Sequence, residues 1–122
     1  MEEEKIMNVE EVDGATVFSF GSSSISGIAD IEKMSRELRD YLEEYRPGHV
    51  VVDFEGVRFI SSQMLGLLVD IWRRLGQHNG TLSISGINPQ LNRVFKITNL
   101  DKIFQFYPDR ESAIQSTNNL EQ

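Results

Sequence analysis

Cysteine is absent from this 122-residue chain, and its absence excludes a disulfide framework, thiolate metal sites and a cysteine nucleophile. Long apolar runs are absent as well, so no segment is expected to cross a bilayer. The first residues, MEEEKIMNVEEVDG, are acidic where a secretory signal would be basic. We therefore expect a protein that is located in the reducing cytoplasm and does not bind a membrane.

Positive charge is scarce. The chain has 12 Lys and Arg residues against 19 Asp and Glu residues, which gives a formal net charge of −7. An acidic protein repels the phosphate backbone, and basic pairs such as Arg73-Arg74 are isolated, so no direct contact with nucleic acid is expected. The charge balance favours a protein or a cationic surface as the partner.

The residues needed for catalysis or cofactor binding are also few. The only histidines are His49 and His78, and neither G-x-S-x-G nor a glycine-rich nucleotide loop occurs. Asp53 invites comparison with a phosphorylated receiver aspartate, but the acidic pair and the lysine of such domains are missing. We interpret Asp53 as a support for the following turn through backbone hydrogen bonds. The sequence predicts no enzyme, no metal site and no cofactor.

An apolar content of 39% is enough for one packed domain. Both ends are polar, so we expect the ordered domain over residues 9–116, with a flexible N-terminus at 1–8 and a flexible tail at 117–122. Asp13-Gly14 separates two short β-rich segments and predicts an antiparallel hairpin. HVVVDF, residues 49–54, is a continuous β-branched run, which is typical of a central strand buried on both faces.

Amphipathic helices alternate with the later strands. Apolar residues from Ile31 to Tyr45 follow a helical period after Asp30, which is a candidate N-cap, and a second such pattern covers residues 61–78. Further strands are expected at 81–85 and 104–107, and shorter helices begin after Asn88 and Asp109. The fold predicted is α/β, with a single mostly parallel sheet, an antiparallel first strand, and helices packed on it.

Two adjacent serines lie where a strand passes into the second helix. In open α/β sheets the binding surface forms beyond the carboxyl ends of the strands, where helices begin. One reading is that Ser61 or Ser62 only caps the helix. The other is that a phosphate is added there, because a helix N-terminus has free N–H groups and a partial positive charge.

The stretch VVVDFEGVRFISSQMLGLL, residues 50–68, resembles the signature of STAS domains, which occur in anti-sigma-factor antagonists and in the cytoplasmic parts of sulfate transporters. The resemblance implies a STAS-like fold, and a serine that an anti-sigma factor with serine kinase activity phosphorylates. Aligning Phe59 and Gly66 puts Ser62 on that position. Ser61 replaces the aspartate of the best-known antagonists, so Ser61 stays open as an alternative acceptor. The resemblance extends to four further segments: Gly21 with its loop, SRELRDYL, TLSISGINPQLNRVF and ITNLDKIFQFYPDRESAI.

We therefore predict an anti-sigma-factor antagonist-like module that regulates transcription by partner switching under serine phosphorylation. The alternative is a scaffold subunit of a larger regulatory assembly, or a homodimer, whose contacts do not depend on phosphate. The candidate phosphorylation sites are Ser62 and Ser61. The predicted partner-binding residues are Ser22, Ser23, Ser24, Ile60, Ser61, Ser62, Gln63 and Met64.

Overall fold

The computed structural model describes the backbone of residues 7–120 and the side chains of residues 7–116. Of the predicted flexible ends, residues 1–6 and 121–122 lie outside the described residues. Residues 7–8 belong to a strand, and residues 117–120 continue the last helix.

Five strands form one sheet in the order β1-β2-β4-β6-β7, and all neighbours are parallel except β1 with β2. Asp13 and Gly14 join that antiparallel pair with φ values of 50° and 85°, as a two-residue hairpin turn requires. The predicted sheet is confirmed. Its strands are β1 (Met7–Val12), β2 (Ala15–Phe20), β4 (His49–Asp53), β6 (Thr81–Ser85) and β7 (Gln105–Tyr107).

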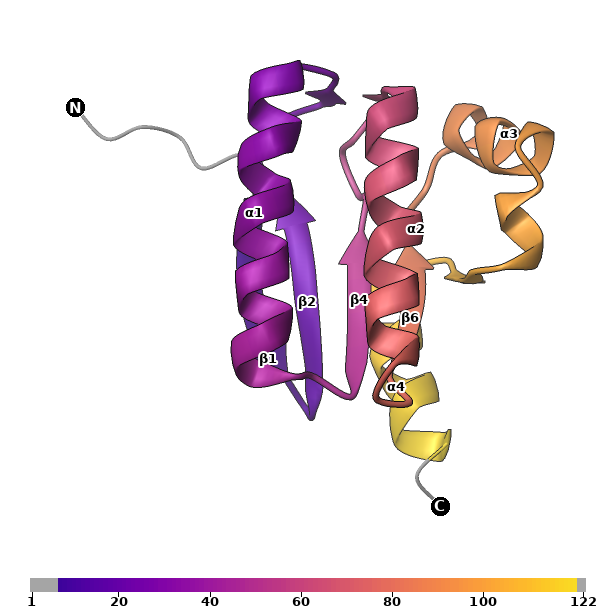
Figure 1. Ribbon diagram of the computed structural model, residues 1–122. Helices are drawn as coiled ribbons and strands as arrows, with labels where there is room; N and C mark the ends of the chain where they lie inside the picture. Colours follow the sequence, from indigo (N-terminus) through magenta and orange to yellow (C-terminus); the bar gives the residue numbers. More distant parts are fainter. Residues whose placement is uncertain (1–6, 121–122) are drawn as a thin grey trace.

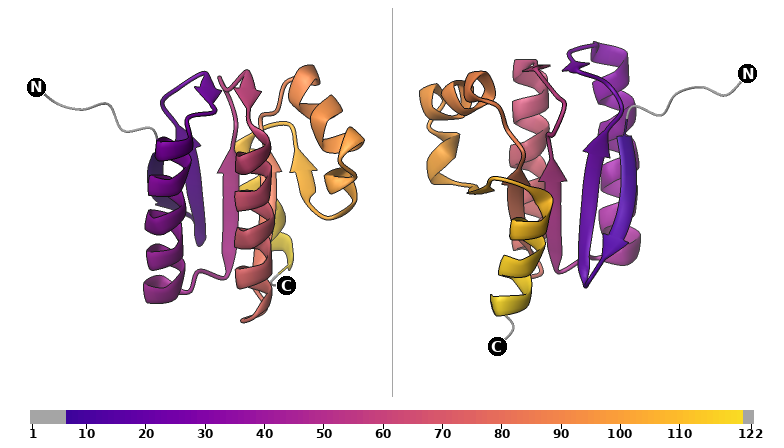
Figure 2. Two further views of the ribbon diagram at one scale, coloured as in Figure 1. Left: turned by 45° about the horizontal axis from the view of Figure 1, so that its top comes forward. Right: turned by 180° about the vertical axis from the view of Figure 1, so that it is seen from behind.

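Helices cover both faces of the sheet, with α1 and α2 on one face and α4 on the other (Figures 1 and 2). This arrangement explains why β4 has no polar face. Val50 and Val52 belong to the core cluster under α1 and α2, whereas Val51 packs with Ala113 of α4. The helices are α1 (Ile28–Tyr45), α2 (Ser62–Gly76), α3 (Pro89–Ile97) and α4 (Arg110–Leu120).

Two details of the helices differ from the prediction. Helix α1 begins at Ile28 with Gly27 as its N-cap, so the predicted cap, Asp30, lies inside the first turn. An acidic residue is favourable there because the helix N-terminus carries partial positive charge. Trp72 lies within the apolar pattern of residues 61–78, which predicts a buried side chain, but it is 41% exposed. It follows Ile71, which is buried, and one residue turns the side chain by about 100° around the helix axis.

Three short elements were not predicted. Strands β3 (Ser24–Ile25) and β5 (Phe59–Ile60) pair in parallel as a small second sheet, and a 3-10 helix, η1, covers Leu100–Lys102. Each has only two or three residues, which is too short for a hydrophobic period. The small sheet matters for function because β5 leads directly into α2.

Candidate functional site

The chain passes from the central strand to α2 through a tight turn. The Val57 N–H donates to the Phe54 carbonyl at 2.9 Å, and Gly56 inside the turn has φ +83°. A residue with a side chain is strained at that φ, so glycine is the residue suited to this position. The turn brings the chain back to the carboxyl end of the sheet, where β5 begins.

Backbone hydrogen bonds join the serine-rich loop of residues 21–27 to the start of α2. The Ser23 carbonyl accepts from the N–H groups of Arg58 at 2.7 Å and Phe59 at 3.2 Å. The Ile25 carbonyl accepts from the Ser61 N–H at 3.0 Å. The loop and the helix start, far apart in sequence, therefore form one continuous surface.

Ser61 is the N-cap of α2 in backbone geometry only. Its φ of −84° and ψ of 167° are extended, and its carbonyl accepts from Met64 N–H and Leu65 N–H at 3.1 and 3.3 Å. Its side chain makes no capping hydrogen bond, and the Oγ atom is buried without a partner among the described residues. The hydroxyl of Ser61 is thus shielded from solvent.

Ser62 is the first residue of α2 and is exposed. The first turn of α2, all of which the structure describes, contains no acidic residue. Helix α3 differs, since Asn88 Oδ1 accepts from Leu91 N–H at 2.8 Å and caps it. No side chain therefore compensates the partial positive charge at the start of α2, and the exposed Ser62 lies at this helix start.

The other predicted contact residues divide into exposed and buried ones. Gln63 is exposed, whereas Ile60 and Met64 are only 6% and 1% exposed and belong to the main core cluster. Their predicted role in direct partner contact does not fit this placement. Both side chains point inward because they follow the inward positions of β5 and α2, and they support the surface from below.

The serine loop contributes hydroxyls beside this surface. Ser22 Oγ donates to the Ser24 carbonyl at 2.9 Å and accepts from the Ser24 N–H at 3.3 Å, which fixes the loop's shape. Ser23 and Ser24 are exposed. The loop is therefore shaped by its own hydrogen bonds at Ser22, while Ser23 and Ser24 are open to solvent.

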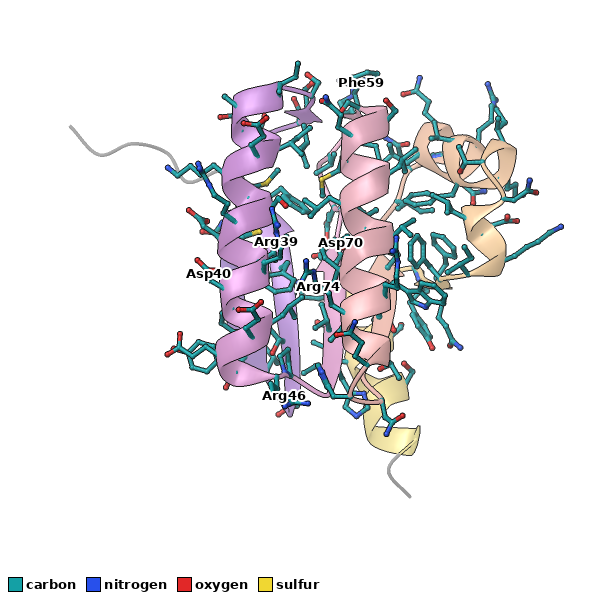
Figure 3. The ribbon with its side chains drawn as sticks, viewed as in Figure 1. Arg39, Asp40, Arg46, Phe59, Asp70 and Arg74 are labelled. Carbon is teal, nitrogen blue, oxygen red and sulfur yellow. The ribbon has the colours of Figure 1, made fainter. Side chains whose placement is uncertain are left out.

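Sequence reasoning missed two exposed apolar residues near the site. Ile28, at the start of α1, is 60% exposed, and Phe59, in β5, is 55% exposed. Figure 3 shows Phe59 at the same end of the molecule as the start of α2. No sequence signal marks Phe59 as the outward residue, because Phe59 and Ile60 are both apolar and β5 has only two residues. Exposed large apolar side chains beside a polar centre are typical of protein-binding surfaces.

Three other residues considered for chemistry have structural partners. His49 Nδ1 pairs with Thr81 Oγ1 at 2.8 Å and His78 Nε2 with the Pro47 carbonyl at 2.9 Å, at the end of the sheet opposite the serines. The Asp53 carboxylate accepts from the Glu55 N–H at 3.2 Å. The interpretation of Asp53 as a support for the turn is confirmed.

Comparisons with known proteins agree with this geometry. The STAS domain family matches residues 7–113, and the chain belongs to that family. The anti-sigma F factor antagonist of Paenibacillus polymyxa is 24% identical over 66 residues, which are 54% of this chain and 56% of that protein. The match thus spans little more than half of that relative's length.

Solved structures share the whole fold. An anti-sigma factor antagonist from Mycobacterium paratuberculosis superposes with a TM-score of 0.78 at 26% identity, covering 90% of this chain and 91% of that one. The Bacillus cell fate determinant SpoIIAA in its phosphorylated form superposes with a TM-score of 0.68 at 16% identity, covering 87% of this chain and 95% of that one.

Within the described residues, the helices are too short or too polar to cross a membrane.

Proposed function

We propose that this chain is an anti-sigma-factor antagonist-like interaction module, which regulates transcription in the cytoplasm by partner switching. Its partner is an anti-sigma factor with serine kinase activity, and Ser62 is the residue that this partner phosphorylates. Membership of the STAS family and the similarity to proteins described as anti-sigma factor antagonists support the proposal. In this account the chain itself is a binding module and the catalytic groups belong to the partner.

The observation that carries the proposal is the contrast between two adjacent hydroxyls. Ser61 Oγ is buried, so a kinase cannot reach it without local unfolding, whereas Ser62 is exposed at the first position of α2. The sequence leaves Ser61 and Ser62 open as phosphate acceptors, and this difference in exposure supports Ser62. A helix start with no acid in its first turn also accommodates a dianionic group without unfolding.

The transfer needs only the serine hydroxyl from this chain. Ser62 Oγ attacks the γ-phosphorus of ATP held by the partner, the bond to the β-phosphate oxygen breaks, and ADP leaves. The hydroxyl proton passes to a base of the kinase, which also supplies the magnesium site. The product carries about −1.5 to −2 additional charge at the position of Ser62.

Phosphorylation would end binding through local electrostatics. Phe59 and Ile28 offer apolar contact area at the same end of the domain, and a partner covering them would also cover Ser62. A phosphate in that contact must lose its water, and it repels any acidic group opposite it. The chain already has a net charge of −7, so the change at the contact outweighs the change in the overall field.

The second candidate is a scaffold subunit whose contacts do not depend on phosphate. It is favoured by the residues around Ser62. The resemblance to the best-known antagonists leads us to expect aspartate before this serine and serine and glycine after it, whereas this chain has Ser61, Gln63 and Met64. A kinase adapted to the usual sequence would meet a different loop here.

Ser62→Glu separates the two candidates. We expect the affinity for the anti-sigma factor to fall at least about tenfold, or 1.4 kcal/mol, because the charge is introduced inside the contact. Gln115→Glu is the matched control, since Gln115 is exposed on α4, on the other face of the sheet. Equal affinities for Ser62→Glu and wild type would leave the scaffold as the better account.

A further inference from the structure

A groove of about 520 Å³ runs between α1 and α2, and of its lining residues the function proposed above uses only Ile28, at one end. Its floor is apolar, since Ile31 and Leu67 are each 6% exposed. Its rims are polar and include Glu32 and Arg36 from α1. Figure 3 shows Arg39 of α1 and Asp70 of α2 directed into the space between the two helices. The groove therefore offers an apolar base with charged sides.

Gly66 lies in this groove, in the interior of α2. Glycine is a poor helix former, and it is usually kept in a helix where space is needed. No other part of the described chain takes up that space, because a Cβ built on Gly66 would meet no atom within 4 Å. The fold itself thus gives no reason for a glycine here, whereas a partner chain that approaches the α2 backbone would.

The charges of the groove are unequally compensated. Asp70 already accepts a hydrogen bond from Arg74 at 3.0 Å. Arg36 has no ion-pair partner among the described residues, and Arg39 donates only to Ser35, to its Oγ at 3.1 Å and its carbonyl at 3.4 Å. The groove is lined by two guanidinium groups and two carboxylates, but Asp70 is paired with Arg74, so Arg36 and Arg39 face only the carboxylate of Glu32 as an unpaired negative group among the described lining residues.

The groove is continuous with the proposed docking surface. Gln63, next to Ser62, and Ile28, at the start of α1, both line its upper end. A partner bound at Ser62 can therefore extend along the groove without leaving the surface. The opening is wide, and a drug-sized ligand would remain largely in solvent there, so a protein segment fits it better than a small molecule.

We infer that the groove between α1 and α2 is a second contact region for the same partner, occupied by a partner segment with acidic and apolar side chains. The apolar side chains rest on Ile31 and Leu67, the segment's backbone approaches over Gly66, and its acidic side chains pair with Arg36 and Arg39. This inference rests on the proposed function, because it assigns the groove to the partner that docks at Ser62.

Filling the groove tests the inference. Gly66→Leu places a side chain in the open space, and leucine is a better helix former than glycine, so α2 is retained. Gly76→Leu is the matched control, because Gly76 also has open space around it but lies outside the groove.

Arg36→Glu tests the charge of the groove by reversing it. Its control is Arg73→Glu, at an exposed position of α2. The probes are the purified anti-sigma factors of the genome that encodes the chain, and affinities are measured by calorimetry.

We expect Gly66→Leu to weaken the complex at least about tenfold and Gly76→Leu to leave it within about twofold of wild type. Arg36→Glu should weaken it most at low salt, and Arg73→Glu should have little effect. If Ser62→Glu abolishes binding but Gly66→Leu binds as wild type does, the inference is overturned and the proposed function stands. If Gly66→Leu weakens binding and Ser62→Glu does not, the groove stands and the phosphate switch falls. A panel in which no anti-sigma factor binds the wild-type chain overturns both.

Discussion

Asp53 at the end of β4 and Arg110 at the start of α4, 57 residues apart in sequence, are joined by a hydrogen bond of 2.9 Å from Arg110 Nε to Asp53 Oδ2. The other carboxylate oxygen accepts from Ser85 Oγ at 3.0 Å. The Asp53 side chain is only 3% exposed, whereas that of Arg110 is 33% exposed. The pair thus links α4 to the central strand, and its two members differ in their access to water.

This difference predicts an asymmetric response to substitution. Arg110→Met leaves a buried carboxylate without its charge partner, and we expect it to lower the free energy of unfolding by about 2–3 kcal/mol. Asp53→Asn should cost less, because the Arg110 head group can still reach solvent. In the double variant the cost should be smaller than for Arg110→Met alone. Urea unfolding checks this, and a double variant less stable than Arg110→Met would contradict it.

Ser61 provides a test of the cap geometry. Its Oγ makes no hydrogen bond among the described residues, so Ser61→Ala should change the free energy of unfolding by less than about 0.5 kcal/mol. Asn88→Ala removes a real capping bond of 2.8 Å and should cost about 1 kcal/mol. Thermal or urea unfolding of the two variants, compared with wild type, measures the contrast. Equal losses would mean that Ser61 caps α2 after all.

Asp109 predicts a dependence of stability on acid pH. The backbone N–H of Ser112 donates to Asp109 Oδ1 at 2.8 Å, and this bond, aided by the Ser112 side chain, lowers the pKa of Asp109 below its ordinary value. A lowered pKa in the folded state means that the contribution to stability is present above the unfolded pKa and is lost as pH falls through the folded one.

Asp109→Asn keeps the acceptor oxygen but does not titrate. We expect its free energy of unfolding to fall less steeply than that of wild type when pH is lowered from about 5 to about 2. Urea unfolding at several pH values measures both slopes. Identical slopes would show that this hydrogen bond does not contribute to acid sensitivity.

The larger elements could be predicted because each carries a repeated local signal. Val50 to Val52 form an uninterrupted β-branched run, and all three are at most 1% exposed, as a strand between two helical layers requires. The start of α1 could not be placed, because Gly27 carries no side-chain signal and Asp30 resembles a cap. Strands β3 and β5 depend on long-range pairing between Ser24 and Phe59, which no local pattern reveals.

The site was predictable in position but not in detail. A strand that passes into an amphipathic helix indicates that Ser61 and Ser62 lie at a helix start, and they do. Which hydroxyl is free depends on the bond from Ser61 N–H to the Ile25 carbonyl, which fixes the backbone before the helix. The groove at Gly66 depends on the packing of α1 beside α2, and only the folded chain defines it.

The most direct test of the account is to locate the phosphate. The chain is incubated with ATP and the anti-sigma-factor kinase that binds it, and the modified residue is identified by mass spectrometry. We predict one phosphate on Ser62 in wild type and in Ser61→Ala, and none in Ser62→Ala. Phosphate on Ser61, or an unmodified chain in a stable complex with the active kinase, would contradict the central claim that the exposed hydroxyl at the start of α2 is the switch.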